Sequence, residues 1–411
     1  MTDSAEVVEV GRNDVFSSGA SAPRTFKDGY FDYNFAKFLG LAPYSGAELG
    51  ECYETAHRIK DGDTESWIEA WVSTAQRIEA YAEEALKGNH KVSAKEAWLR
   101  ATTYYQAAFF FTLNNDPRKA QIYEKHTGCF QSAGKFFDPP LEVLSIPYEG
   151  KSLFGYFLRG GSDSKPRPTV LIQMGADGSS EQIYFSGGGA AAVRRGYNAL
   201  IFEGPGQTGT FMRGRSLTYR YDWEVPVKAV VDFALTKPEV DPARIALIAY
   251  SMGGYLGPRA ISFEKRIAAC IVSGLVPSMI ALSGLRRFEE AAGANGNYNH
   301  SQKWLLYEHM PKYGLNNGID DLEKFRTILE SFNLYGLEDK ITCPLLVVQA
   351  AGEGEAQVKL AKAFYDKLSN PNPHNKFRLT TEAEGAEMHC QKGNVMLLHA
   401  IEFDWLDDVW T

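Results

Sequence analysis

The sequence has little cysteine, and its cysteines follow no pattern. Five cysteines are scattered singly along 411 residues, and no two of them stand in a CxxC spacing. An odd and dispersed set of thiols argues against a disulfide framework and against a cysteine-based zinc site. We therefore expect reduced thiols in a cytoplasmic protein, and we expect neither a metal nor another cofactor.

Long apolar runs and an excess of positive charge are also missing. No stretch reaches the roughly 20 apolar residues that a membrane-spanning helix needs, and the acidic residues 1–14 do not have the pattern of a signal peptide. The net charge is −8, whereas a surface that binds nucleic-acid phosphates has to be cationic. These absences argue against a membrane or a nucleic-acid partner and favour a soluble enzyme that acts on a small molecule.

The stretch IALIAYSMGGYLGPRA, residues 245–260, carries the strongest functional signal. Residues 245–249 are apolar and predict a short buried strand, and a helix-compatible run follows the turn. Within the turn, Ser251 has Ala249 two positions before it and Gly253 two positions after it. Small residues at these positions permit the sharp strand-to-helix turn that exposes a serine hydroxyl above a parallel sheet, although glycine is more usual than alanine at the first. We interpret the stretch as a nucleophile elbow, not as a serine in an ordinary glycine-rich turn.

The spacing of apolar residues along the chain changes once. Residues 63–111 carry apolar residues three or four positions apart, which predicts two antiparallel helices, and a third helix is expected from residue 117 to about 135. The aromatic-rich residues 26–41 have to be buried, either in this helical domain or against a second subunit. Beyond Pro139 and Pro140, short apolar strands alternate with helices. This alternation predicts a doubly wound, mostly parallel sheet, as in the α/β-hydrolase fold.

The expected strands are residues 141–148, 152–159, 169–174, 199–202, 245–249, 267–272, 345–349 and 377–381. Polar, helix-prone sequence interrupts the alternation before the last two strands and predicts a lid over the carboxyl end of the sheet, where the sites of α/β proteins lie. The predicted parts are a flexible tail (1–24), a helical domain (25–138), two parts of an α/β-hydrolase core (139–275 and 336–411) and a helical lid insertion (276–335).

A serine hydroxyl needs a base and a carboxylate that orients the base. In hydrolases of this architecture the chain order is serine, acid, histidine. His389 follows the last expected strand on a glycine-containing loop, and we predict that it is the base. The acid is expected after strand 345–349, where AAGEGEAQV offers two glutamates and no aspartate. The spacing from the first glycine favours Glu355 and leaves Glu353 as the alternative.

An oxyanion hole requires two backbone N–H groups that point at the developing charge. Met252, directly after the serine, is expected to supply one of them. The other is expected from Ala176 in the loop GADGSSEQ, which follows a predicted strand. Asp177 in the same loop either faces the site, where it could orient water or substrate, or caps the helix that follows.

Several segments together resemble one branch of the α/β-hydrolases. They are SAKEAWLRATTYYQAAFFF, GADGSSEQ, FEGPGQ, YSMGG, ITCPLLVV and GAEMHCQKGN. The branch holds bacterial dihydroxy-pseudooxynicotine hydrolase and fungal hydrolases that shorten polyketide chains in pigment pathways, and the resemblance covers most of the chain from about Trp67 onward. It implies Ser251 as nucleophile, His389 as base, an acid at Glu355 and an auxiliary carboxylate at Asp177. It also implies a homodimer with the site between the helical domain and the core. Glu355 departs from the aspartate that is usual in the family.

Two functional hypotheses follow. The first is a serine hydrolase that acts on a carbonyl of a bulky aromatic or polyketide-like metabolite, and the resemblance favours cleavage of a carbon–carbon bond beside a ketone. Ester or thioester hydrolysis, and intramolecular acyl transfer that closes a lactone or lactam, would use the same residues. The second is a catalytically silent interaction protein that binds a partner through its helical domain.

Overall fold

Helices dominate the first third of the chain. The computed structural model describes residues 23–283, 293, 296 and 298–411. The predicted tail lies almost entirely outside these residues, and so does part of the predicted lid. The helices before the first strand are α1 (Gly29–Leu39), α2 (Leu49–His57), α3 (Thr64–Lys87), α4 (Lys91–Phe111) and α5 (Arg118–Gly134).

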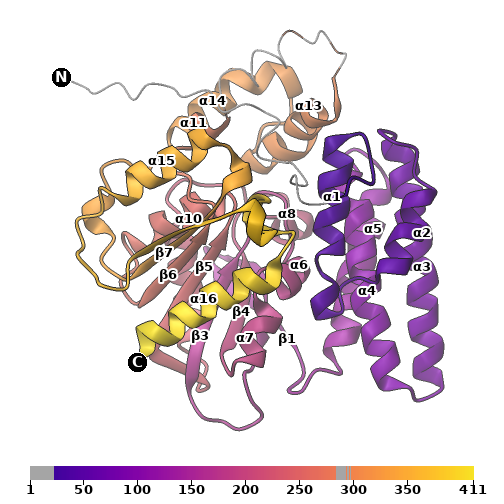
Figure 1. Cartoon of the computed structure of the whole chain (residues 1–411), viewed down its shortest axis with the longest axis horizontal. Helices are drawn as coiled ribbons and strands as arrows, with labels where there is room; N and C mark the ends of the chain where they lie inside the picture. Colours follow the sequence, from indigo (N-terminus) through magenta and orange to yellow (C-terminus); the bar gives the residue numbers. More distant parts are fainter. Residues whose placement is uncertain (1–22, 284–292, 294–295, 297) are drawn as a thin grey trace.

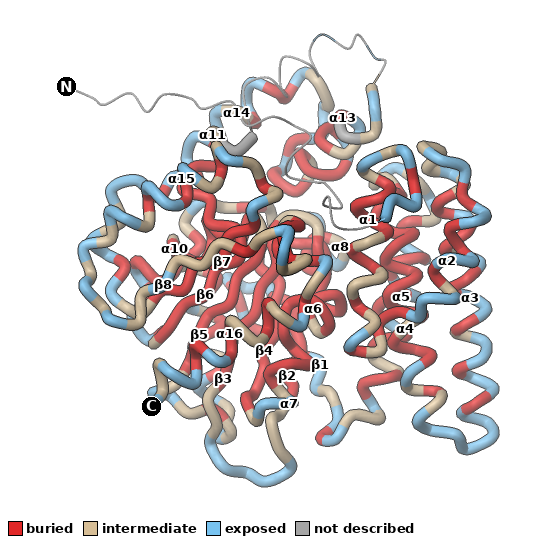
Figure 2. Tube along the Cα trace, viewed as in Figure 1, coloured by how far each residue is buried: buried red, intermediate tan, exposed pale blue. Residues whose placement is uncertain are grey.

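The helical part stands beside the sheet, and α1 is on the side that faces the α/β core (Figure 1). α3 and α4 pack along most of their length, and their inner faces are buried (Figure 2). Most of the aromatic-rich segment 26–41 lies in α1. The amino end of this helix is capped by Asp28, which accepts hydrogen bonds from the N–H groups of Tyr30 and Phe31 at 2.9 and 3.0 Å. The expected burial of this segment is provided within the chain, because Phe31 and Phe38 are fully buried there.

Eight strands form one mostly parallel sheet in the order β1-β2-β4-β3-β5-β6-β7-β8. Only the pairs β1–β2 and β2–β4 are antiparallel. The strands are β1 (Glu142–Tyr148), β2 (Lys151–Leu158), β3 (Arg167–Gln173), β4 (Asn198–Glu203), β5 (Val240–Tyr250), β6 (Ala269–Ser273), β7 (Leu345–Ala350) and β8 (Lys376–Thr380). Each expected strand overlaps one of these, and the predicted fold class is confirmed.

Helices cover both faces of the sheet (Figure 2), so strands such as β4 and β7 are buried along their whole length. The core helices are α6 (Ser180–Ser186), α7 (Gly189–Arg194), α8 (Thr208–Arg213), α9 (Glu224–Ala234), α10 (Gly253–Ile261), α15 (Glu355–Tyr365) and α16 (Val395–Trp410). Because strand side chains alternate, Val170 and Ile172 pack into the core shared with the helical part, while Leu171 packs into the opposite core. The helical stretch after the β3 loop is broken into α6 and α7 at Gly188, whose φ of 86° cannot continue a right-handed helix.

The insertion after β6 contains α11 (Met279–Ser283), α13 (His300–Trp304), a π-helical turn (Leu305–His309) and α14 (Leu322–Glu330). It lies above the sheet and reaches toward the helical part (Figure 1). Among the described residues, no helix is both long enough and apolar enough to cross a bilayer.

Candidate active site

The turn after β5 has the geometry of a strained elbow. Ser251 directly follows Tyr250, the last residue of β5, and has a φ of 60°, in the left-handed region that side chains disfavour. Its N–H donates to the Ser273 carbonyl at 2.9 Å, and its own carbonyl accepts from the N–H of Gly254 at 2.7 Å. A Cβ on Gly254 would lie 1.8 Å from the carbonyl oxygen of Gly274, so only glycine fits there. The turn therefore depends on glycine at Gly254, one residue beyond the position singled out in the sequence.

Three side chains from three loops form a hydrogen-bonded chain. The Oγ of Ser251 lies 2.9 Å from Nε2 of His389. The other ring nitrogen, Nδ1, is hydrogen-bonded to the Glu353 carboxylate, whose second oxygen accepts from the amide of Gln349. The loops follow β5, β7 and β8 at the carboxyl edge of the sheet. Such a chain can move the serine proton to the imidazole and stabilise the imidazolium that results.

Glu355 does not contact His389, so its expected placement beside the histidine is wrong. It is the first residue of α15, its side chain is 81% exposed, and it pairs with Lys359 one turn later at 2.6 Å. The intervening Gly354 has a φ of 91° and turns the chain, so that Glu353 points inward while Glu355 faces solvent. The alternative acid, Glu353, occupies the position instead.

The surroundings of His389 favour its protonated form. Burial alone would lower the pKa of the imidazole, but the neighbouring Cys390 and Glu353 raise it well above the ordinary value of 6.5. Cys390 Sγ lies 3.5 Å from Nε2 of His389. The ring is thus prepared to hold a proton once the serine has released it.

The loop after β3 lies directly against the elbow. A Cβ on Gly175 would come within 2.6 Å of the Met252 nitrogen and 2.9 Å of the Ser251 Cβ. The Gly175 carbonyl accepts from the hydroxyl of Tyr219 at 3.0 Å. In a trans peptide the next N–H points away from that carbonyl, so the N–H of Ala176 is turned away from Tyr219. Among the described residues, the N–H of Met252 has no backbone partner. The N–H of Ala176 also has no backbone partner among these residues, and the role of both N–H groups as an oxyanion hole stays a prediction.

Three side chains anchor this loop, and none of them was predicted from the sequence. The amide of Gln207 donates to the carbonyls of Met174 and Gly175, and its oxygen accepts from Gly204 at 2.7 Å. Tyr219 holds the Gly175 carbonyl, and Lys312 of the insertion donates to the Ala176 carbonyl at 2.6 Å. Gln207 belongs to the FEGPGQ segment that carries part of the family resemblance, so a signal for it was present in the sequence.

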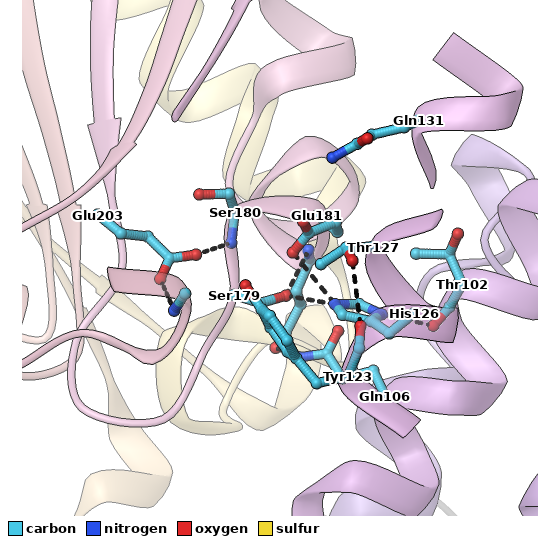
Figure 3. A network of polar contacts seen from close by, with 12 residues as sticks. Thr102, Gln106, Tyr123, His126, Thr127, Gln131, Ser179, Ser180, Glu181 and Glu203 are labelled. Carbon is cyan, nitrogen blue, oxygen red and sulfur yellow. Dashed lines mark hydrogen bonds and ion pairs between the residues drawn. The ribbon is translucent and has the colours of Figure 1, made fainter. Parts of the chain in front are cut away.

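A buried polar network joins the helical part to the same loop (Figure 3). The ring of His126 in α5 lies 2.8 Å from Ser179 Oγ and 3.1 Å from a carboxylate oxygen of Glu181, while its other nitrogen lies 2.8 Å from the Thr102 carbonyl. Burial alone would raise the pKa of Glu181, but the His126 charge and hydrogen bonds lower it below its usual value. Burial and the charge of Glu181 raise the pKa of nearby Glu203, which accepts from the N–H of Ser180 at 2.6 Å. The start of α6 is thereby fixed from both sides.

A pocket with about 340 Å³ of empty space lies between α4, α5, α8, the insertion and the loop after β3. The apolar part of its wall is formed by Phe109, Phe110, Phe211, Met212 and Trp304. Charged side chains from the helical part, the loop and the insertion complete it, so the pocket exists only where these parts meet.

Asp177 lines this pocket and does not cap the following helix. The cap of α6 is Ser179, whose hydroxyl accepts from the N–H of Gln182 at 3.3 Å. Of the two interpretations of Asp177 from the sequence, the helix cap is wrong, and a role of the carboxylate in the site stays a prediction.

Comparison with known proteins identifies relatives along most of the chain. The family described as "Esterase FrsA-like" matches residues 50–283, more than half of the chain. The 20-hydroxy-prefusarin hydrolase FUS2 of Gibberella moniliformis is 30% identical over 420 residues, covering 94% of this chain and 98% of its own. Hydrolase LUC6 of a Fusarium species is 31% identical over 414 residues, covering 94% and 97%.

A solved structure shows the same fold. The crystal structure of 2,6-dihydroxy-pseudo-oxynicotine hydrolase matches with a TM-score of 0.70 at 21% identity, covering 90% of this chain and 95% of that one. The resemblance inferred from the sequence segments is thereby confirmed. The chain therefore belongs to the FrsA-like esterase family and is a hydrolase of the α/β-hydrolase type.

Proposed function

We propose that this protein is a serine hydrolase that cleaves a bond next to a carbonyl of a bulky, largely apolar metabolite. The observation that carries the proposal is the hydrogen-bonded chain Ser251–His389–Glu353, with 2.9 Å between the serine oxygen and the imidazole. It favours an enzyme over the alternative of a catalytically silent interaction protein, because the imidazole contacts both the serine hydroxyl and the carboxylate, as an activated nucleophile requires.

In the proposed reaction, Ser251 Oγ attacks the substrate carbonyl carbon and its proton passes to Nε2 of His389. The carbonyl electron pair moves to oxygen, which the N–H groups of Met252 and Ala176 stabilise. When the intermediate collapses, the bond to the leaving group breaks and its electron pair stays with that group, which takes the proton from His389. Water, deprotonated by the same imidazole, then attacks the acyl-enzyme to release a carboxylic acid and restore the serine.

The pocket supports a bulky substrate. Its aromatic wall suits an extended or ring-containing acyl chain. FUS2, which is 30% identical to this chain, is named for action on 20-hydroxy-prefusarin. We propose that the scissile bond is the carbon–carbon bond of a ketone or 1,3-diketone, with ester hydrolysis using the same residues. Asp177 faces the pocket and would orient water or the leaving group.

Labelling with a fluorophosphonate probe tests the proposal directly. We expect the probe to attach to Ser251 in the wild type and not in Ser251→Ala. We also expect that variant to lose at least about 1,000-fold in kcat on p-nitrophenyl esters and on aromatic 1,3-diketones. An unlabelled wild-type serine, or a Ser251→Ala variant that still turns over, would reject the nucleophile assignment.

A further inference from the structure

Lys37 of α1 is a buried cation at the boundary between the helical part and the core. α1 runs along that boundary (Figure 1), and its carboxyl end touches the loop that carries His389, because a Cβ on Gly40 would lie 2.3 Å from the Lys392 carbonyl oxygen. Lys37 itself is only 6% exposed. Tyr33, one helical turn earlier on the same face, is also buried. This face of α1 therefore points into the molecule at the level of the active site.

The ammonium of Lys37 differs from the other lysines that the structure shows to be buried. Lys119 is paired with Glu308, Lys312 donates to the Ala176 carbonyl at 2.6 Å, and Lys392 donates to Ser186 Oγ at 3.0 Å. Among the described residues, no hydrogen bond or ion pair joins Lys37 Nζ to another group. The nitrogen instead lies 4.0 Å from the centre of the Phe110 ring and 4.8 Å from that of Phe38. A ring face only partly replaces the solvation that a buried charge loses.

The position of the ammonium relates it to the pocket. The Phe110 ring beneath it belongs to the pocket wall, and so does Asp177. Burial lowers the pKa of Lys37 to about 8, and the nearby negative charge of Asp177 limits the decrease. Asp177 nevertheless forms no ion pair with Lys37 or with any other described residue. Asp177 therefore lines the pocket directly, whereas Lys37 lies against the Phe110 ring of the pocket wall, and the two opposite charges do not pair with each other.

We propose that Lys37 is a substrate-binding residue whose ammonium holds a negatively charged oxygen of the substrate, such as the enolate of a 1,3-dicarbonyl group or a carboxylate. The inference rests on the proposed function, since it places this oxygen in the pocket of the same hydrolase. A charge-assisted hydrogen bond from a buried ammonium gives strong selection for such a group. The enzyme then prefers bulky apolar molecules that carry an acidic oxygen over neutral molecules of the same size.

The test compares wild type with Lys37→Met, which keeps the length of the side chain, and Lys37→Arg, which keeps its charge. The probes are neutral p-nitrophenyl butyrate, the anionic mono-p-nitrophenyl ester of glutaric acid, and benzoylacetone, an aromatic 1,3-diketone. We expect Lys37→Met to lower kcat/KM at least ten-fold on one or both acidic probes and less than three-fold on the neutral ester, with Lys37→Arg retaining most of the preference. Lys87→Met, whose side chain is 74% exposed, is the matched control.

Equal effects of Lys37→Met on all three probes, or no effect on any, would overturn the proposal. A purely structural lysine would shift the melting temperature and all activities together. Binding separates this inference from the proposed function. In Ser251→Ala, which should bind without turnover, adding Lys37→Met should raise the Kd for benzoylacetone at least ten-fold, and an unchanged Kd contradicts the inference even if the protein proves not to be a serine hydrolase. Should Lys37→Met not fold, Lys37→Gln takes its place in both assays.

Discussion

Glu353 and Glu355 are separated by one glycine and have opposite surroundings. Glu353 is 1% exposed and bonded to His389, whereas the Glu355 side chain is 81% exposed. We predict that Glu353→Gln lowers kcat by about 100-fold to 10,000-fold, because the amide cannot stabilise the imidazolium. The matched variant Glu355→Gln should leave kcat unchanged, since it removes only a surface ion pair. Steady-state kinetics on a p-nitrophenyl ester measure both. A larger loss of kcat in Glu355→Gln than in Glu353→Gln would identify Glu355 as the acid.

The raised pKa of His389 has a consequence for the pH profile. The imidazole has to be neutral to accept the serine proton, so activity falls as pH drops through its pKa. Since that pKa is well above 6.5, the acidic limb of kcat/KM should have its midpoint above pH 6.5. Glu353→Gln removes a negative charge that favours the imidazolium, and its residual activity should show a midpoint at lower pH. A wild-type midpoint below 6.5 would contradict the electrostatic account.

At the scale of single residues, the sequence predicts some of the side-chain contacts in the site and not others. The proximity of Ser251 and His389 follows from motif, spacing and chain order. The choice between Glu353 and Glu355 depends on the backbone at Gly354, and no spacing rule gives that angle. A usable signal was present, because Glu355 and Lys359 form an i,i+4 pair, which is typical of an exposed helix face. No sequence pattern singled out Lys37, because only the packing of α1 against the core distinguishes it from other lysines.

Helices and strands were also predictable only where the pattern of the sequence determines them. The strands were predictable because buried parallel strands are short apolar runs between turns. α3 and α4 were predictable from their apolar spacing. α1 was recognised only as an aromatic segment that needed burial, since almost all of its faces contact other parts and its pattern shows no polar side. The break between α6 and α7 depends on one left-handed glycine, Gly188.

The elbow is the element whose shape depends most on one glycine. In Gly254→Ala the new Cβ would meet the Gly274 carbonyl oxygen at 1.8 Å, and neither backbone can move without shifting Ser251. We predict a loss of about 3 kcal/mol in unfolding free energy and a larger loss of activity than of folded protein. Urea unfolding and esterase assays on the same samples measure the two.

Gly128→Ala is the matched control for the elbow glycine. Gly128 lies within α5, and a Cβ there has no heavy atom within 4 Å. Alanine should stabilise that helix by up to about 1 kcal/mol and leave activity unchanged. If Gly254→Ala behaved like Gly128→Ala, the close approach at the elbow would be without consequence.

At the scale of the whole molecule, the helical part is not an independent appendage. The aromatic core of α1 and α3 is continuous with one face of the sheet, through residues such as Phe130 and Tyr156, whose ring centres lie 5.0 Å apart. The helical part should therefore unfold together with the sheet. The homodimer expected from the family resemblance stays a prediction, and light scattering on the purified chain tests it.

The insertion and the helical part are joined by a buried ion pair. Lys119 of α5 and Glu308 of the insertion are 4% and 6% exposed, and Lys119 also donates to the Thr112 carbonyl at 2.5 Å. Glu308 accepts from the N–H of Asn114 as well. Removing one partner leaves an unpaired buried charge, so Lys119→Met and Glu308→Leu should each lower the unfolding free energy by about 3–5 kcal/mol.

The double variant of Lys119 and Glu308 shows what the ion pair contributes to stability and to the shape of the pocket. If its role is to seat the insertion on the helical part and close the pocket, Lys119→Met/Glu308→Leu should recover most of the lost stability, because two apolar side chains can fill the same space. KM should nevertheless stay raised, since both residues line the pocket and the geometry of its wall changes. The exposed pair Lys362–Asp366 is the control, and Lys362→Met should change neither quantity. Additive losses in the double variant would mean that each residue acts through other contacts, and the closure of the pocket would then depend on the aromatic wall instead.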